Sequence, residues 1–158
     1  MNSSSEFAVI VGLAMMAGLG AWLVDGRPSY VAVEEQLAQA ELKEGEIRLE
    51  DLMKLGEEET VWVDARREDE WKADGLEGSI HVTTLSDDDI GTQLERHVDL
   101  LFGAKRMVIY CSDLNCGMSH ELAELIKKKY ADMVPSEVLV LHGGMTALRV
   151  AGRVRNSN

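Results

Sequence analysis

The sequence of 158 residues contains two cysteines, Cys111 and Cys116, and few basic residues. Two cysteines are too few for a disulfide scaffold, and a domain of this length needs no such support. There are 16 lysines and arginines against 28 aspartates and glutamates, which gives a net charge of −12. Because such a surface repels phosphate backbones and anionic lipid headgroups, we expect no nucleic-acid partner. Internal repeats and low-complexity segments are also absent from the sequence.

One apolar segment, residues 7–24, carries no charged side chain. A helix needs about 17–25 apolar residues to cross a bilayer core of about 30 Å, so this segment is just long enough. A cleaved signal peptide is the alternative, but residues 1–6 contain no Lys or Arg. The apolar run also exceeds the 7–15 residues that are usual, roughly, for a signal core. We therefore predict an N-terminal tail at 1–6 and one transmembrane helix at 7–24.

The charges around this helix leave its orientation open. Only Arg27 and Lys43 follow it closely and none precedes it, which is too few for the positive-inside rule. The prediction is therefore a single-pass membrane protein with either orientation. Small residues spaced as Ala14 and Gly18 permit two such helices to pack as a homodimer, although this pattern is common.

Residues 25–45 are predicted to link the anchor to a folded domain. Pro28 ends any helix that runs out of the membrane. The segment Tyr30–Glu44 has apolar residues on one face and is followed by Gly45, a pattern typical of a short amphipathic helix with a glycine stop.

Residues 46–152 alternate short apolar runs with helical patterns. The runs that we expect to form strands are 47–49, 61–63, 79–82, 107–110 and 138–141. The segments that we expect to form helices are 50–55, 119–130 and a short helix after Gly144, and Ile90, Leu94, Val98 and Leu101 also repeat at helical spacing. This alternation is typical of βαβ units around a mostly parallel sheet, so the predicted fold class is α/β. Many functions share that class.

Three stretches of this region carry short motifs in a fixed order. The first is VDARREDEW at 63–71, which matches D-x-R-x-x-x-E-aromatic through Asp64, Arg66 and Glu70. The second is the apolar run at 108–110 that leads into Cys111, and the third is LHGGMTAL at 141–148, similar to L-x-G-G-x-x-A-W. Together these motifs resemble the rhodanese-like domain family over residues 46–152, with 153–158 as a C-terminal tail.

The resemblance implies a three-layer domain with a largely parallel five-stranded sheet and helices on both faces. It also implies a sulfurtransferase, since the loop cysteine of the family takes up a sulfur atom as a persulfide and passes it on. That cysteine corresponds to Cys111, and the reaction is expected to need no cofactor or metal. The resemblance does not indicate the sulfur donor or the thiol acceptor. The active-site loop after it comprises Ser112, Asp113, Leu114, Asn115, Cys116, Gly117, Met118 and Ser119. The resemblance gives structural roles to Asp64, Arg66, Glu70, Gly143 and Gly144, and we expect an i,i+4 ion pair between Arg66 and Glu70.

The loop departs from the family pattern. Ser119 follows Cys111 by eight positions where the family has six, and Met118 stands where Arg is common. The only charged side chain between Cys111 and Ser119 is that of Asp113. The C-x5-R signature of the related dual-specificity phosphatases is absent, which argues against a phosphatase. Outside the loop, Gly75, Glu77 and Leu148 replace the usual His, Pro and Trp at structural positions.

The position of Cys111 favours a reactive thiol. A cysteine between a strand end and a helix N-terminus meets converging N–H groups and the positive end of the helix dipole, and both stabilise the thiolate. The alternative is a small buried hydrophobic residue. Cys116 is either an incidental thiol or a resolving partner that forms a disulfide with Cys111. The second function class is therefore a non-catalytic or thiol-redox module that binds a partner at the membrane.

The remaining polar candidates are weaker. His120 lies in the first turn of the helix expected after the loop, where it either shuttles protons or, as we expect, faces water. His142 is equally open, and we expect ordinary roles for His81 and His97. The run Asp87–Asp89 predicts a solvated turn, because no spaced calcium ligands follow it.

Overall fold

The computed structural model describes residues 30–112 and 117–154. The predicted tail at 1–6, the predicted transmembrane helix at 7–24 and the loop residues 113–116 lie outside the described residues. Within the part of the chain that is described, no helix is long and apolar enough to span a membrane.

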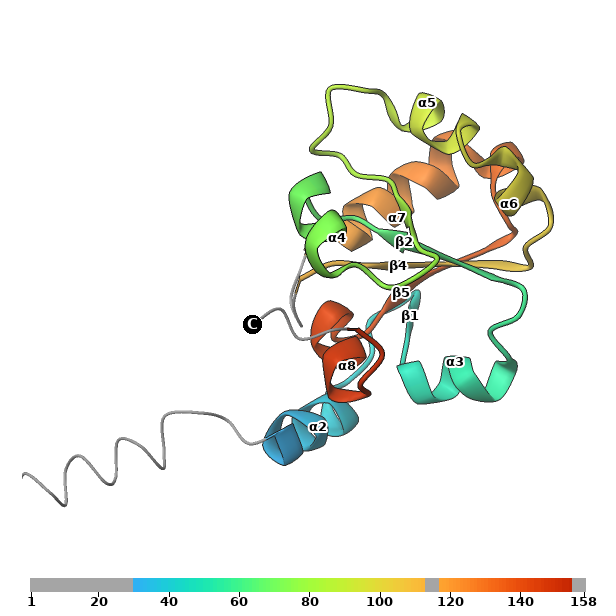
Figure 1. The fold of residues 1–158 in the computed structure, drawn as a ribbon. Coiled ribbons are helices and arrows are strands. Elements are labelled where there is room, and N and C mark those ends of the chain that lie inside the picture. Colours follow the sequence, from blue (N-terminus) through green and yellow to red (C-terminus); the bar gives the residue numbers. More distant parts are fainter. Residues whose placement is uncertain (1–29, 113–116, 155–158) are drawn as a thin grey trace, which may run out of the picture. The chain divides into compact units, whose positions relative to one another are not determined.

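A five-stranded sheet forms the middle layer of the domain (Figure 1). The strands are β1 (Glu46–Ile47), β2 (Thr60–Asp64), β3 (Ile80–His81), β4 (Arg106–Tyr110) and β5 (Glu137–Leu141). Their spatial order is β1-β5-β4-β2-β3, and all four pairings are parallel. This confirms the predicted α/β fold with a five-stranded parallel sheet. Because the sheet is parallel, its carboxyl edge gathers the residues that follow each strand.

Helices cover both faces of this sheet (Figure 1). The helices of the described residues are, in chain order, α2 (Tyr30–Gln39), α3 (Leu49–Leu55), α4 (Glu68–Asp74), α5 (Ile90–Glu95), α6 (Val98–Phe102), α7 (Gly117–Lys129), the 3-10 helix η1 (Ala131–Met133) and α8 (Gly144–Val150). Side chains of β4 alternate between two apolar clusters. Met107 and Ile109 pack with α5, α6 and α7 on one face, while Val108 and Tyr110 pack with α3 and α8 on the other. Burial on both sides explains why the strands read as continuous apolar runs.

The residues that repeat at helical spacing between Ile90 and Leu101 are divided between two helices, α5 and α6. The backbone leaves the helical conformation at His97 (φ −124°, ψ 17°), which ends the regular spacing. Val98 is consequently exposed, whereas Ile90, Leu94 and Leu101 are buried.

Helix α2 ends at Gln39, earlier than the predicted Glu44. The guanidinium of Arg48 donates hydrogen bonds to the carbonyls of Ala40 (2.7 Å) and Ala38 (3.4 Å) near the end of this helix. A cation there satisfies carbonyls that have no partner within the helix and complements the negative end of its dipole.

Candidate active site

Cys111 follows directly after β4, the central strand, at the carboxyl edge of the sheet. In open parallel sheets this edge is where ligands bind. A hydrogen bond ties the backbone of Cys111 to α8, since the Cys111 carbonyl accepts from the N–H of Met145 (2.7 Å). Its side chain is 2% exposed and belongs to the apolar cluster under α7.

The sulfur of Cys111 faces the first turn of α7. Its Sγ atom lies 3.4 Å from the hydroxyl oxygen of Ser119, which is itself buried. The structure records Cys111 as disulfide-bonded, so its sulfur carries no proton and the Ser119 hydroxyl is the donor. The chain contains one other cysteine, Cys116, which lies outside the described residues together with Asp113, Leu114 and Asn115. Of the remaining loop residues, Ser112 is half-buried, and Gly117 and Met118 begin α7.

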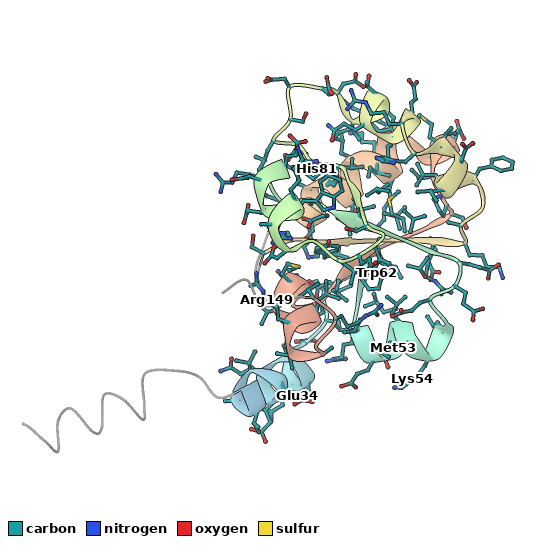
Figure 2. The ribbon with its side chains drawn as sticks, viewed as in Figure 1. Glu34, Met53, Lys54, Trp62, His81 and Arg149 are labelled. Carbon is teal, nitrogen blue, oxygen red and sulfur yellow. The ribbon has the colours of Figure 1, made fainter. Side chains whose placement is uncertain are left out.

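Asp64, which ends β2, anchors a buried network of charges beside this edge. Its carboxylate accepts hydrogen bonds from Arg66, with Nη2 to Oδ2 at 2.7 Å, and both side chains are at most 3% exposed. Arg66 also donates to Asp74 (2.8 Å), and Asp74 accepts from Arg149 of α8 (2.5 Å; Arg149 is labelled in Figure 2). Burial alone would lower the pKa of Arg66, but its hydrogen bonds to Asp64 and Asp74 outweigh burial and raise it. Arg66 therefore stays charged.

The predicted ion pair between Arg66 and Glu70 is wrong. The helical spacing does not apply, because α4 begins at Glu68 and the preceding residue, Arg67, is extended. Glu70 instead accepts from Arg67 (3.3 Å) on the surface, which closes the first turn of the helix. Arg66 turns inward to the two aspartates.

Gly143 and Gly144 form the turn between β5 and α8. Both have positive φ values, +79° and +49°, a conformation that side chains with a Cβ rarely adopt. The turn reverses the chain so that α8 begins beside Cys111, and this is how the N–H of Met145 reaches the Cys111 carbonyl.

Three residues that the sequence did not group together form a polar cluster on the α7 face of the sheet. The Glu46 side chain on β1 is 4% exposed, and its carboxylate hydrogen-bonds Nδ1 of His142 (3.0 Å) and Nε2 of His120 (2.9 Å). It also accepts the backbone N–H of Lys43 (3.0 Å). Burial raises the pKa of Glu46, but the hydrogen bonds from Lys43, His142 and His120 lower it more, so the net shift is downward.

The expectation that His120 simply faces water is therefore wrong, since its Nε2 atom is committed to Glu46. A sequence signal existed for His142. His142 follows Val138 and Val140 in steps of two residues, and alternate residues of a strand point to the same face of the sheet. The side chains of Val138 and Val140 point to the α7 face. Among the described residues, no group of three or more His, Cys, Asp or Glu side chains is arranged to hold a metal ion.

A family model described as a rhodanese-like domain matches residues 48–151. The chain belongs to the rhodanese-like domain family. Among solved structures, this rhodanese-like chain is similar to a protein of Bacillus halodurans, with 21% identity over 70% of this chain and 76% of that one and a TM-score of 0.52. It is also similar to the As-Sb reductase of Leishmania major, with 22% identity over 68% of this chain and 78% of that one and a TM-score of 0.52.

Likeness at this identity shows the shared fold. A comparison with curated proteins finds no match. Family membership places Cys111, at the end of the central strand, inside the matched region.

Proposed function

We propose that this rhodanese-like protein is a sulfurtransferase that carries sulfur as a persulfide on Cys111. The position of Cys111 carries the proposal, because this cysteine directly follows the central strand within the family-matched region and its Sγ lies 3.4 Å from the Ser119 hydroxyl. That hydroxyl can donate a hydrogen bond to a thiolate or a persulfide, and the N-terminus of α7 adds positive potential.

The proposed transfer has two steps. The Cys111 thiolate attacks the sulfane sulfur of a donor, a sulfur–sulfur bond forms, and the rest of the donor leaves with the electrons of the broken bond. A thiol acceptor then attacks the outer sulfur and becomes the persulfide, while Cys111 returns as a thiolate. Burial of Cys111 protects the persulfide from competing reactions in water.

The test is to reduce the full chain, treat it with thiosulfate or with a low-molecular-weight persulfide, and locate the added mass by peptide mass spectrometry. The expected result is one extra sulfur atom on the Cys111 peptide, removed by a thiol acceptor and absent from Cys111→Ser. Unmodified Cys111 with both donors would exclude sulfur transfer by this residue.

Thiol-redox chemistry is the second candidate, favoured by the disulfide recorded at Cys111. We propose that Cys116 is its resolving thiol. Attack by the Cys116 thiolate on the inner sulfur of a Cys111 persulfide gives a disulfide and releases hydrosulfide. Attack on a Cys111 sulfenic acid gives the same disulfide and releases hydroxide, which takes a proton from solvent to become water. The closed ring is short, so it suits a switch better than a structural link. Under peroxide, Cys116→Ser should let Cys111 oxidise to sulfinic acid, whereas the wild-type chain should stop at the disulfide.

We also propose that residues 7–24 anchor the protein in a membrane as a single-pass helix. The anchor would hold the folded domain at the membrane, where it could bind a partner. Its support is the uncharged apolar sequence. The full chain should remain in the membrane fraction after high-salt and alkaline washes, and a chain beginning at Ser29 should be soluble. An uncleaved full-length chain in the soluble fraction would contradict the anchor.

A further inference from the structure

We infer that His142 is a further catalytic residue that takes the proton of the Cys111 thiol, and that Glu46 is the positioning residue for its imidazole. This inference rests on the proposed function in one respect, since it identifies the base that prepares the sulfur-accepting thiolate. The three residues then form a nucleophile, a base and an orienting carboxylate.

The strand register places the two reacting side chains next to each other. Ile109 of β4 pairs with Val140 of β5, so Cys111 and His142, each two residues further on, occupy adjoining positions. Neighbouring strands lie about 4.8 Å apart. Both side chains also point to the same face of the sheet, since Cys111 belongs to the α7-side cluster and His142 lies two residues after Val140, which belongs to the same cluster.

The carboxylate of Glu46 fixes which nitrogen of His142 carries the proton. A carboxylate accepts hydrogen bonds, so Nδ1 of His142 must be the donor in their 3.0 Å contact. In the neutral imidazole Nε2 then holds a lone pair. That atom is buried, in a side chain that is 7% exposed, and finds no hydrogen-bond partner among residues 30–112 and 117–154. A buried polar atom without a partner is costly, which suggests that a ligand or another state of the protein supplies one.

In our proposal the partner of Nε2 is the Cys111 thiol in the reduced protein. Cys111 is disulfide-bonded, so it has no S–H proton to offer. Once the disulfide is reduced, the thiol can donate to Nε2. Proton transfer then gives a Cys111 thiolate and a His142 imidazolium, whose Nδ1–H faces Glu46. The thiolate attacks the sulfane sulfur, and the imidazolium balances the charge of the resulting persulfide anion.

The other charged groups around His142 come from the elements that pack on this edge. Glu46 of β1 contacts His142 directly, and His120 of α7 shares the same carboxylate. The ammonium of Lys127, also on α7, lies beside Gly45 at the start of β1. The hydrogen bonds from the two imidazoles and from the backbone N–H of Lys43 keep the Glu46 carboxylate ionised.

The experiment follows alkylation of Cys111 against pH in the reduced full chain, in a Cys116→Ser background that leaves one thiol. His142→Asn retains an amide N–H that can donate to Glu46 but offers no acceptor in place of Nε2. We expect its half-maximal alkylation to move upward by about one pH unit, and the rate at about pH 6 to fall roughly tenfold. Glu46→Gln should shift the profile in the same direction by less. His97→Asn, a histidine between α5 and α6, is the matched control and should leave the profile unchanged.

The outcomes separate this inference from the proposed function. An unchanged profile in His142→Asn would overturn the role of His142, whether or not sulfur is transferred. A shifted profile without any persulfide in the wild type would support His142 and reject the sulfurtransferase. If His142→Asn does not fold, imidazole ¹⁵N spectra of the reduced Cys116→Ser chain decide the matter. The Nε2 signal of His142 should change on Cys111→Ala, and an unchanged signal would overturn the inference.

Discussion

Arg66 and Asp64 form a buried ion pair between residues two positions apart, with Nη2 and Oδ2 at 2.7 Å. The chain bends at Arg66, whose backbone N–H also donates to Oδ1 of Asp64 (3.0 Å), so the guanidinium reaches back to the carboxylate at the end of its own strand. Its other Nη atom binds Asp74, and Asp74 binds Arg149, so four alternating charges join the end of β2 to α4 and α8. This network lies beside the edge that holds Cys111.

Removing Arg66 should be strongly destabilising. Arg66→Met leaves Asp64 without its cation in a site that is fully buried, and breaking a buried pair on one side costs about 3–5 kcal/mol. Urea unfolding followed by circular dichroism measures the loss. Arg67→Met is the matched control, since its pairs with Asp69 and Glu70 are exposed and such pairs contribute at most about 1 kcal/mol. Equal losses in the two variants would contradict the importance of the buried pair.

Asp74 should make stability depend on acid. Burial raises its pKa, but the hydrogen bonds from Arg149 and Arg66 lower it more, so the pKa lies below its ordinary value. A depressed pKa contributes stability above the unfolded pKa of about 3.9, and this contribution is lost as the pH falls through the folded pKa. Urea midpoints should therefore fall as the pH decreases below about 5, and less steeply in Asp74→Asn. The exposed Asp69→Asn serves as the control and should keep the wild-type slope.

Gly143 should tolerate alanine less well than Gly152, although both have positive φ values (+79° and +67°). A Cβ at Gly143 would overlap a methyl carbon of Leu37, whereas a Cβ at Gly152 meets nothing within 4 Å among the described residues. Left-handed backbone costs a residue with a Cβ about 1–2 kcal/mol. Gly152→Ala should show this cost alone, and Gly143→Ala should show more. In a Leu37→Ala background the difference measured by urea unfolding should shrink, and a constant difference would contradict the steric explanation.

Asp113 should limit activity toward thiosulfate, a small dianion. Between Cys111 and Ser119 the sequence offers this acid and no Lys or Arg. One unit charge at about 6 Å and an effective dielectric constant of about 20 changes the binding free energy by about 3 kcal/mol before salt screening. The wild type should be a poor thiosulfate sulfurtransferase, and Asp113→Arg should raise kcat/KM at least roughly tenfold. Asp132→Arg, on the surface 3-10 helix η1, is the charge-matched control. Efficient wild-type turnover without a gain in Asp113→Arg would contradict this explanation.

The sequence predicted the longer strands well because a parallel sheet covered on both faces leaves a clear apolar signature, but the strand predicted at 47–49 is wrong at its end, where Leu49 begins α3. The run at 107–110 coincides with β4 except for Arg106, and the cysteine after it lies at the carboxyl edge as expected. Local periodicity failed where the chain leaves the regular helix. Val98 follows the helical spacing of Ile90 and Leu94, yet it lies beyond the break at His97 and is exposed.

The cluster around Glu46 was beyond the reach of local patterns. Its contacts with His120 and His142 span 74 and 96 positions in the sequence. They depend on β1 pairing with β5, and neither strand carries a motif that indicates this pairing. The ion pair of Arg66 with Asp74 was also beyond local patterns, since it depends on where the Arg66 side chain points after a bend in the chain.

The strand order also sets the order in which the chain is able to fold as it is synthesised. Strand β5, the last to emerge from the ribosome, lies between β1 and β4. Until Glu137–Leu141 has emerged, β1 has no strand to pair with, and the nascent chain holds only the three-stranded unit of β4, β2 and β3. Pairing of β1 with β5 closes the long stretch of chain between them, and such closure is slow compared with the formation of local contacts. The Glu46–His142 contact and the hydrogen bond from Met145 to Cys111 therefore form last, so the thiol acquires its full surroundings only after nearly the whole domain has been translated.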